Sequence, residues 1–216
     1  MINKNNISFY RVPLVCNAVP TIGCGSRSKP VLKDLENDET INEAWLNQKG
    51  TIIAVLWNDK IDEKLRDKII QNIFNNNKLS FISQRLTSFN DNFASFQTDK
   101  NAWLRGSDVD ELSKEEASII ADQILVVYKQ KGSLSAIQEK NLRKCILGKF
   151  FDFFLNFKSF NELSNTSAYR SILLDVINSS KSYLDTEQIP EINSLLKACM
   201  GHSENCTESS CCNPET

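Results

Sequence analysis

The sequence predicts an α+β protein with two domains and a tail, and three observations lead to this prediction. Strand-like and helix-like patterns alternate over residues 1–85, which indicates a mixed domain. Helical spacing prevails over residues 107–200, which indicates an all-helical domain, and residues 86–106 are interpreted as a connector. Residues 201–216 carry three acidic side chains, no lysine or arginine and three of the seven cysteines, so we expect a flexible Cys-rich tail.

The first domain begins with a strand and a glycine-containing loop. Residues 7–16 (ISFYRVPLVC) are rich in β-branched and aromatic side chains, which favours a strand, and Pro13 indicates an edge or a bulge. The loop TIGCGSRS follows at residues 21–28. We expect a helix from Lys29 and Pro30 with Ser28 as its N-cap, because proline suits the first helical turn.

A hairpin, a helix and a last strand complete this domain. Residues 41–46 and 51–57 are apolar runs joined by a short connection that contains Gly50, which is typical of a hairpin. Apolar residues recur at helical spacing from Asp62 to Phe74, three asparagines at 75–77 end that helix, and residues 79–82 suit a strand. The resulting order of strand, helix, strand, strand, helix, strand is the split βαβ or ferredoxin-like arrangement.

The second domain is predicted from helix caps and apolar stripes. Ser113 and Glu116 have the spacing of a capping box, in which a hydroxyl and a carboxylate satisfy the first amides of a helix. That helix should end at Gly132, and the cap pattern at Ser135 to Gln138 precedes a long helix through residue 157. Two more helices are expected over residues 167–183 and 187–200.

Charge and composition exclude several classes of protein. The 25 Lys and Arg against 27 Asp and Glu give a net charge of −2, which lacks the basic excess of a nucleic-acid binder. No stretch approaches the ~20 apolar residues that span a bilayer, and residues 1–10 have no features of a secretory signal. We therefore expect a cytoplasmic protein without a membrane span. Its seven cysteines, an odd number, should be mostly reduced.

Cys24 lies between two glycines in the loop before the first predicted helix. Free amides at a helix start, together with the cations Arg27 and Lys29, would lower the pKa of its thiol and favour the thiolate that attacks or binds metal. Cys16, eight residues upstream, is a candidate second sulfur that the loop could bring close. The alternative is that Cys16 is a small buried residue and the loop is only a turn.

The stretch Ile22-Gly23-Cys24-Gly25-Ser26-Arg27, with its place between strand and helix, resembles the Gly-Met-x-Cys-x-x-Cys motif of heavy-metal-associated domains in metallochaperones and metal-transporting ATPases. Residues 43–47 (EAWLN) resemble the second-strand pattern of that family, and the resemblance covers about residues 7–84. It implies a ferredoxin-like fold and a soft metal ion at Cys24. Arg27 stands where the family has its second cysteine, so Cys16 or the tail would supply the other sulfur.

Cys24-Gly25-Ser26-Arg27 is also similar to the nucleophile loop of glutaredoxin-like arsenate reductases. That resemblance implies a thiol-dependent oxidoreductase, in which Cys24 attacks an oxyanion that Arg27 helps to hold. The hairpin at 41–57 differs from the parallel strand that such a fold has after its first helix. We keep this enzyme as the alternative.

A second cluster of soft ligands lies near the C-terminus and consists of Cys199, His202, Cys206, Cys211 and Cys212. Four such ligands satisfy a tetrahedral zinc ion, whereas thiolates alone suit copper(I) or another thiophilic ion. The spacing reproduces no zinc finger, and the alternative is a tail with incidental thiols.

Taken together, these patterns predict a protein that binds a soft or thiophilic metal ion for sequestration, sensing or transfer. The ion would bind at Cys24 and Cys16 and in the C-terminal cluster, and a metal transporter or another thiol protein is the expected partner. Two alternatives stay open. One is the thiol enzyme, and the other is a protein-interaction module whose thiols are incidental.

Overall fold

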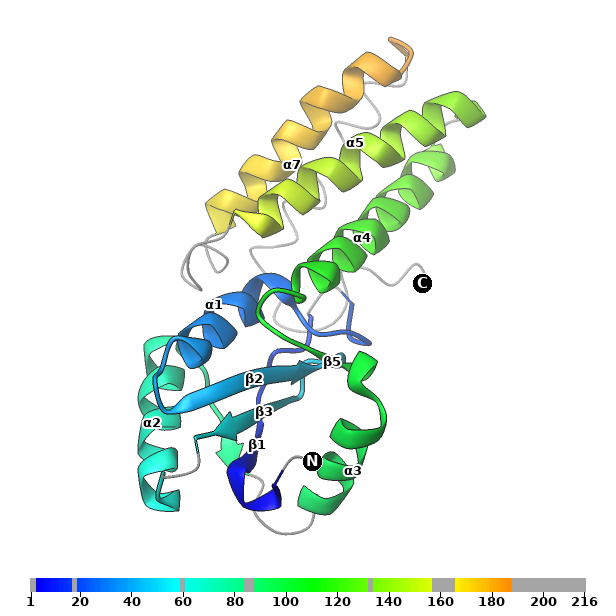
Figure 1. The fold of residues 1–216 in the computed structure, drawn as a ribbon. Helices are drawn as coiled ribbons and strands as arrows, with labels where there is room; N and C mark the ends of the chain where they lie inside the picture. The colour runs from blue at the N-terminus through cyan, green and yellow to red at the C-terminus, as the bar shows by residue number, and fades with distance from the viewer. Residues whose placement is uncertain are drawn as a thin grey trace. The chain divides into compact units, whose positions relative to one another are not determined.

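The computed structural model describes residues 3–16, 19–58, 61–83, 88–131, 134–156 and 166–187 (Figure 1). The chain forms two compact units. The first consists of Met1–Glu116 with Phe154–Asn161, and the second of Ala117–Phe153 with Glu162–Thr216. The predicted helix over residues 187–200 lies outside the described residues, apart from its first residue, and so does the whole predicted tail.

In the described part of the first unit, five strands form one antiparallel sheet. They are β1 (Ile7–Arg11), β2 (Ile41–Asn47), β3 (Ile52–Trp57), β4 (Ile82–Ser83) and β5 (Trp103–Leu104). The sheet order is β4-β1-β3-β2-β5, and all neighbours are antiparallel. Helix α1 (Gly25–Glu36) connects β1 to β2, and α2 (Glu63–Asn76) connects β3 to β4. The predicted α+β class is confirmed.

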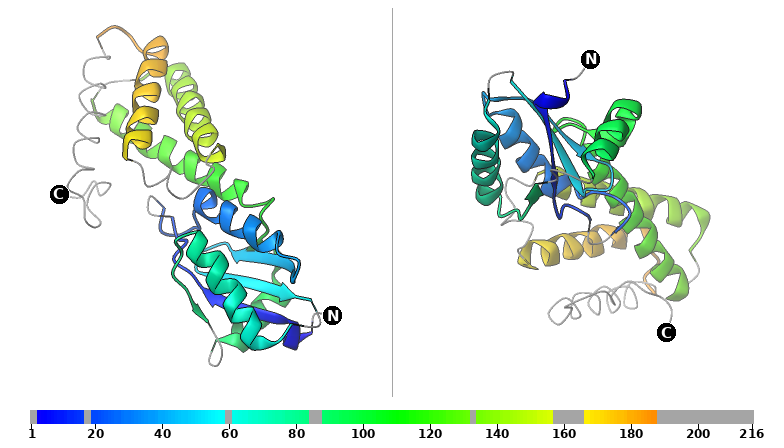
Figure 2. Two further views of the ribbon diagram at one scale, coloured as in Figure 1. Left: turned by 90° about the vertical axis from the view of Figure 1, so that its left-hand side faces the viewer. Right: turned by 90° about the horizontal axis from the view of Figure 1, so that it is seen from below.

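Helices cover both faces of this sheet (Figures 1 and 2). Helices α1 and α2 lie on one face, where the ring centroids of Tyr10 and Phe74 are 6.1 Å apart. Helix α3 (Phe89–Thr98) lies on the other face, where the rings of Phe96 and Trp103 are 5.2 Å apart and both pack near Phe9. Because β3 is covered on both sides, its sequence (IIAVLW) is apolar throughout instead of alternating.

Helix α3 and strand β5 lie in the stretch 86–106, for which the sequence predicts only a connector. Phe89, Phe93 and Phe96 recur at helical spacing and join the cluster that covers the sheet face opposite α1 and α2. The apolar stripe is narrow and stands among polar residues, so its helical period becomes evident only when the sheet face that it covers is known.

Among the described residues of the second unit, three helices lie side by side (Figure 1). They are α4 (Asp110–Lys131), whose first seven residues belong to the first unit, α5 (Ala136–Leu155) and α7 (Thr166–Ser180), which a short 3-10 helix, η3 (Lys181–Tyr183), follows. Leu142, Ile146 and Phe150 are fully buried along one face of α5. The predicted cap of α5 is confirmed, because Ser135 and Gln138 exchange side-chain and backbone hydrogen bonds.

Two helix starts differ from the prediction. Helix α1 begins at Gly25 with Cys24 at the N-cap, so Ser28 is inside the helix, where its hydroxyl donates to the carbonyl oxygen of Cys24 at 2.6 Å. Pro30 therefore stands in the second turn, where its missing amide removes one helical hydrogen bond. Helix α4 begins at Asp110, so Ser113 lies in its first turn and forms no capping box with Glu116.

Candidate functional site

The chain around the two N-terminal cysteines folds back on itself. Strand β1 ends at Arg11, earlier than predicted, and residues 14–16 and 22–24 then form a short antiparallel ladder around the Val15–Gly23 bridge. The Cys16 amide donates to Ile22 at 2.9 Å, and the Cys24 amide donates to Leu14 at 2.8 Å. In this register Cys16 and Cys24 are diagonal neighbours on the same face of the ladder, with Cα atoms about 7–8 Å apart.

Glycines hold this ladder against the hairpin between β2 and β3. Gly50 has φ of 71°, and a Cβ atom there would collide with the carbonyl oxygen of Leu14. A Cβ atom on Gly23 would approach the Cα of Gly50 to 3.0 Å. The Gly23 amide also donates to the carbonyl oxygen of Gln48 at 2.7 Å. The close approach of backbone to backbone fixes the position of the loop that carries Cys24.

Both thiols are buried. Cys16 is 1% exposed and Cys24 is 5% exposed. The amide of Val19 donates to the sulfur of Cys16 at 3.3 Å, and the sulfur of Cys24 lies 3.4 Å from the hydroxyl oxygen of Ser26. The structure thus brings together the two cysteines that the sequence analysis proposed as a pair.

A buried carboxyl group lies against both thiols. Glu116 of α4 is 6% exposed, and its Oε2 atom finds no hydrogen-bond partner among the described residues. Burial raises the pKa of Glu116, and the neighbouring thiols of Cys16 and Cys24 lower it only in part. Burial also raises the pKa of both thiols, and the negative charge of Glu116 raises it further.

The predicted net lowering of the Cys24 pKa is wrong, although the predicted direction of the Arg27 effect is right. Arg27 does lower the pKa of Cys24, but this effect is smaller than that of burial and Glu116, so the pKa of the thiol is raised. Lys29 forms an ion pair with Asp110, and its Nζ atom lies 2.8 Å from each carboxylate oxygen. The carboxyl group of Glu116, 92 positions downstream of Cys24, has no signal in the sequence around Cys24, and together with burial it outweighs the adjacent cation Arg27.

The sulfurs of Cys16 and Cys24 suit a soft ion with two ligands better than a metal site that needs three or four protein ligands. Within the described ranges, no three His, Cys, Asp or Glu side chains form a group that could hold a metal ion. Two sulfurs from Cys16 and Cys24 suffice for an ion that prefers thiolates, such as copper(I). The C-terminal candidates lie outside the described residues and are Cys199, His202, Cys206, Cys211 and Cys212.

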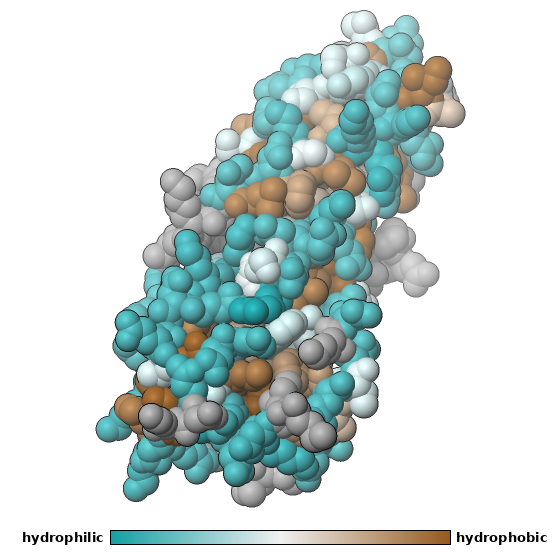
Figure 3. Space-filling model, in the orientation of Figure 1, coloured by the Kyte–Doolittle hydropathy of each residue, from teal (hydrophilic) through white to brown (hydrophobic). Residues whose placement is uncertain are grey.

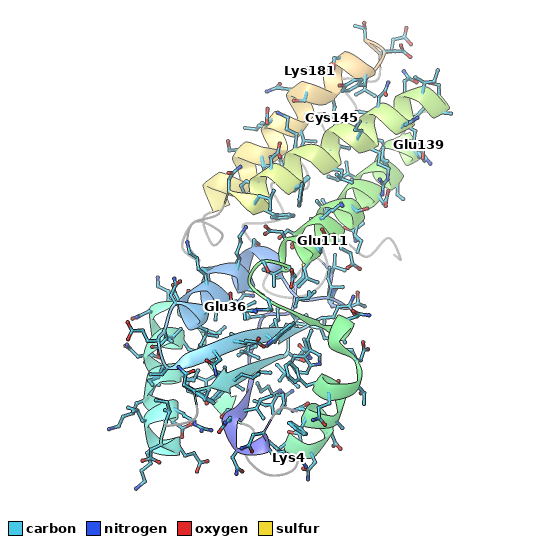
Figure 4. The ribbon with its side chains drawn as sticks, viewed as in Figure 1. Lys4, Glu36, Glu111, Glu139, Cys145 and Lys181 are labelled. Carbon is cyan, nitrogen blue, oxygen red and sulfur yellow. The ribbon has the colours of Figure 1, made fainter. Side chains whose placement is uncertain are left out.

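Cys145 is separate from this site. It lies on α5 in the second unit, half-buried, and lines an open pocket of about 360 Å³ with Lys144, Gly148, Lys149 and Tyr183 (Figure 4). Burial raises the pKa of its thiol, and the charge of Lys149 lowers it in part. Lys149 itself forms an ion pair with Asp175 at 2.7 Å.

Glu116 is the site residue that sequence reasoning assigned to another role, and one signal could have identified it. Val109, Leu112, Glu116 and Ile120 follow the spacing of an apolar helical stripe, and all four are buried. A carboxyl group on such a stripe indicates a buried partner, because charged side chains are rarely buried without one.

Comparison with known proteins found no family model, no curated protein and no solved structure that matches this chain. Across the part of the chain that the structure describes, no helix is long and apolar enough to cross a membrane. The face shown in Figure 3 is largely hydrophilic, with apolar side chains between polar ones.

Proposed function

We propose that this protein binds a soft or thiophilic metal ion through the thiols of Cys16 and Cys24, for sequestration, sensing or transfer. The observation that carries the proposal is that Cys16 and Cys24, from the two segments of one short ladder, lie on the same face of it and are both buried. An ion of this class replaces the two thiol protons, so raised thiol pKa values make its binding strongly dependent on pH.

Cys16 and Cys24 are both free thiols in the structure, so both sulfurs are available to one ion.

The sheet order and the place of Cys24 support a ferredoxin-like, heavy-metal-associated-like domain as part of the same proposal. Cys24 stands between the first strand and the first helix, as in the motif that it resembles. The order β4-β1-β3-β2 agrees with the split βαβ arrangement. Within the proposal, a reducing compartment such as the cytoplasm keeps both thiols available, and a metal transporter or another thiol protein exchanges the ion with them.

The thiol-enzyme alternative has less support. A nucleophilic cysteine needs a depressed pKa and some exposure, and it is usually found in an electropositive environment. Cys24 is 5% exposed, and both burial and the charge of Glu116 raise the pKa of its thiol. These properties oppose attack on an oxyanion.

The proposal is tested by anaerobic titration of copper(I), with a chromogenic chelator as competitor and native mass spectrometry for stoichiometry. The five C-terminal candidate ligands are first replaced together, Cys by Ser and His by Ala, so that only the N-terminal site is measured. We expect one ion per chain in this background and at least a tenfold loss of affinity for Cys16→Ser and for Cys24→Ser. Cys145→Ser is the matched control and should retain the affinity.

Two results would overturn the proposal. One is that the background protein with Cys16 and Cys24 intact binds no ion. The other is that Cys145→Ser weakens binding as much as the two test substitutions, which would mean that thiols bind the ion without regard to position. The contribution of the C-terminal ligands follows from the ions lost between the wild-type chain and the background protein.

A further inference from the structure

The buried thiols lie beneath the start of α4. Leu112 approaches the loop so closely that its Cδ1 atom would be 3.2 Å from a Cβ atom on Gly23. A Cβ atom on Gly25 would collide with the carbonyl oxygen of Val109 and the hydroxyl of Ser113. Glu116, one turn further along the helix, is also buried, and its charge raises the pKa of both thiols. We call residues 109–116 the α4 cover; it lies entirely within the first unit.

Where the α4 cover packs against the loop that carries Cys24, which we call the thiol loop, two buried polar atoms lack a hydrogen-bond partner among the described residues. The hydroxyl oxygen of Ser113, which is 1% exposed, and Oε2 of Glu116 are buried and find no hydrogen-bond partner among the described residues. A buried polar group without a partner destabilises the state that buries it. Separation of the cover from the loop would return both oxygens to water, and this favours local opening at the contact.

An ion pair opposes this separation. The Nζ atom of Lys29 on α1 lies 2.8 Å from each carboxylate oxygen of Asp110 in the cover, and about a third of each side chain is exposed. Lys29 lies five residues beyond Cys24, which occupies the N-cap position of α1. The pair therefore links the cover to the element that carries one of the two sulfurs.

We infer that the α4 cover controls access to the Cys16–Cys24 pair, opening by local separation from the thiol loop and held closed by the Lys29–Asp110 ion pair. The inference rests on the proposed function, because it gives the metal ion its route to thiols that are otherwise buried. The unsatisfied oxygens of Ser113 and Glu116 favour the open state, and the ion pair favours the closed one.

The test is the rate at which a small neutral maleimide modifies each cysteine in the folded, metal-free full chain, resolved by peptide mass spectrometry. Asp110→Asn weakens the ion pair and should accelerate modification of Cys16 and Cys24 about two- to fivefold. Ser113→Ala removes an unsatisfied hydroxyl from the closed state and should slow both at least about threefold. Neither Asp110 nor Ser113 is among the groups that shift the pKa of either thiol, so the rates report access.

Asp122→Asn is the matched control, since it breaks another surface ion pair, with Arg143, in the second unit. It should leave the rates at Cys16 and Cys24 unchanged. Low concentrations of urea separate local opening from global unfolding, because local opening exposes little surface and its rate changes little with urea. We expect this shallow dependence for the wild type and for both variants.

The inference is overturned if Asp110→Asn leaves the rates as Asp122→Asn does, or if modification of Cys16 and Cys24 follows global unfolding at every urea concentration. Because modification needs no metal, its outcome is independent of the titration. Failure to bind copper(I) with the expected labelling rates would refute the proposed function and leave the cover as a control of thiol exposure. Normal binding with unaltered labelling rates would refute the cover alone.

Discussion

Glu116 has the most unusual environment of any single residue in the described part of the chain, where it is the only buried acidic or basic side chain. Its raised pKa means that the folded state favours the protonated carboxyl group. The stabilisation from that protonated group is fully present below the ordinary pKa of 4.5 and is lost as the pH rises through the higher folded value. Glu116 therefore makes the protein less stable at neutral pH than a neutral side chain of the same size would.

The substitution Glu116→Gln should raise the free energy of unfolding at pH 8 by about 1–3 kcal/mol, because it removes a buried charge and keeps an acceptor for the thiols. At pH 4 the difference from the wild type should shrink, since the wild-type carboxyl group is then protonated in both the folded and the unfolded state. Urea unfolding at the two pH values measures both quantities.

Glu115→Gln is the matched control for this experiment, because Glu115 is the neighbouring residue on α4 and is exposed. It should change stability by less than about 0.5 kcal/mol at either pH. A Glu116→Gln protein that is less stable than the wild type at pH 8 would contradict the assignment of Glu116 as a disfavoured buried charge.

At the scale of elements, two serines that look equivalent in sequence have different roles. Ser135 caps α5 and exchanges hydrogen bonds with Gln138, whereas Ser113 lies inside α4 with no partner for its hydroxyl among the described residues. Ser135→Ala should therefore lower the free energy of unfolding by about 1 kcal/mol. Ser113→Ala should not lower it, and equal losses for both, measured by urea unfolding, would contradict these assignments.

The elements that could be predicted are those whose signals are local. The hairpin depends on Gly50, which adopts a left-handed conformation, and α2 stops where Asn77 caps its end. The elements that were missed depend on distant partners. Helix α3 packs its phenylalanines on a sheet formed by residues up to 89 positions away, and α1 begins early because Gly25 fits against α4.

The same distinction applies to the candidate site. The pairing of Cys16 with Cys24 could be proposed, because eight residues separate them and a loop with glycines lies between. The role of Glu116 could not, because its partners are 92 and 100 positions away and its spacing from Ser113 imitates a local cap. The direction of the thiol pKa shift was mispredicted for this reason, since Glu116 and burial outweigh Arg27.

At the scale of the whole molecule, the thiol pair, its carboxyl group and the α4 cover all belong to the first unit. The proposed ion site is therefore complete without the second unit, although α4 continues into it. Cys145 is the remaining described cysteine and lies in the second unit, which makes it a natural reference thiol in the same chain.

The most direct test of the central claim is a double-mutant cycle on copper(I) affinity with Cys16→Ser, Cys24→Ser and the combined variant, all in the background without the C-terminal ligands. If both sulfurs bind one ion, either single substitution removes most of the affinity and the second adds little, so the two effects are strongly non-additive. Additive effects, or single variants that retain wild-type affinity, would contradict a shared ion at Cys16 and Cys24.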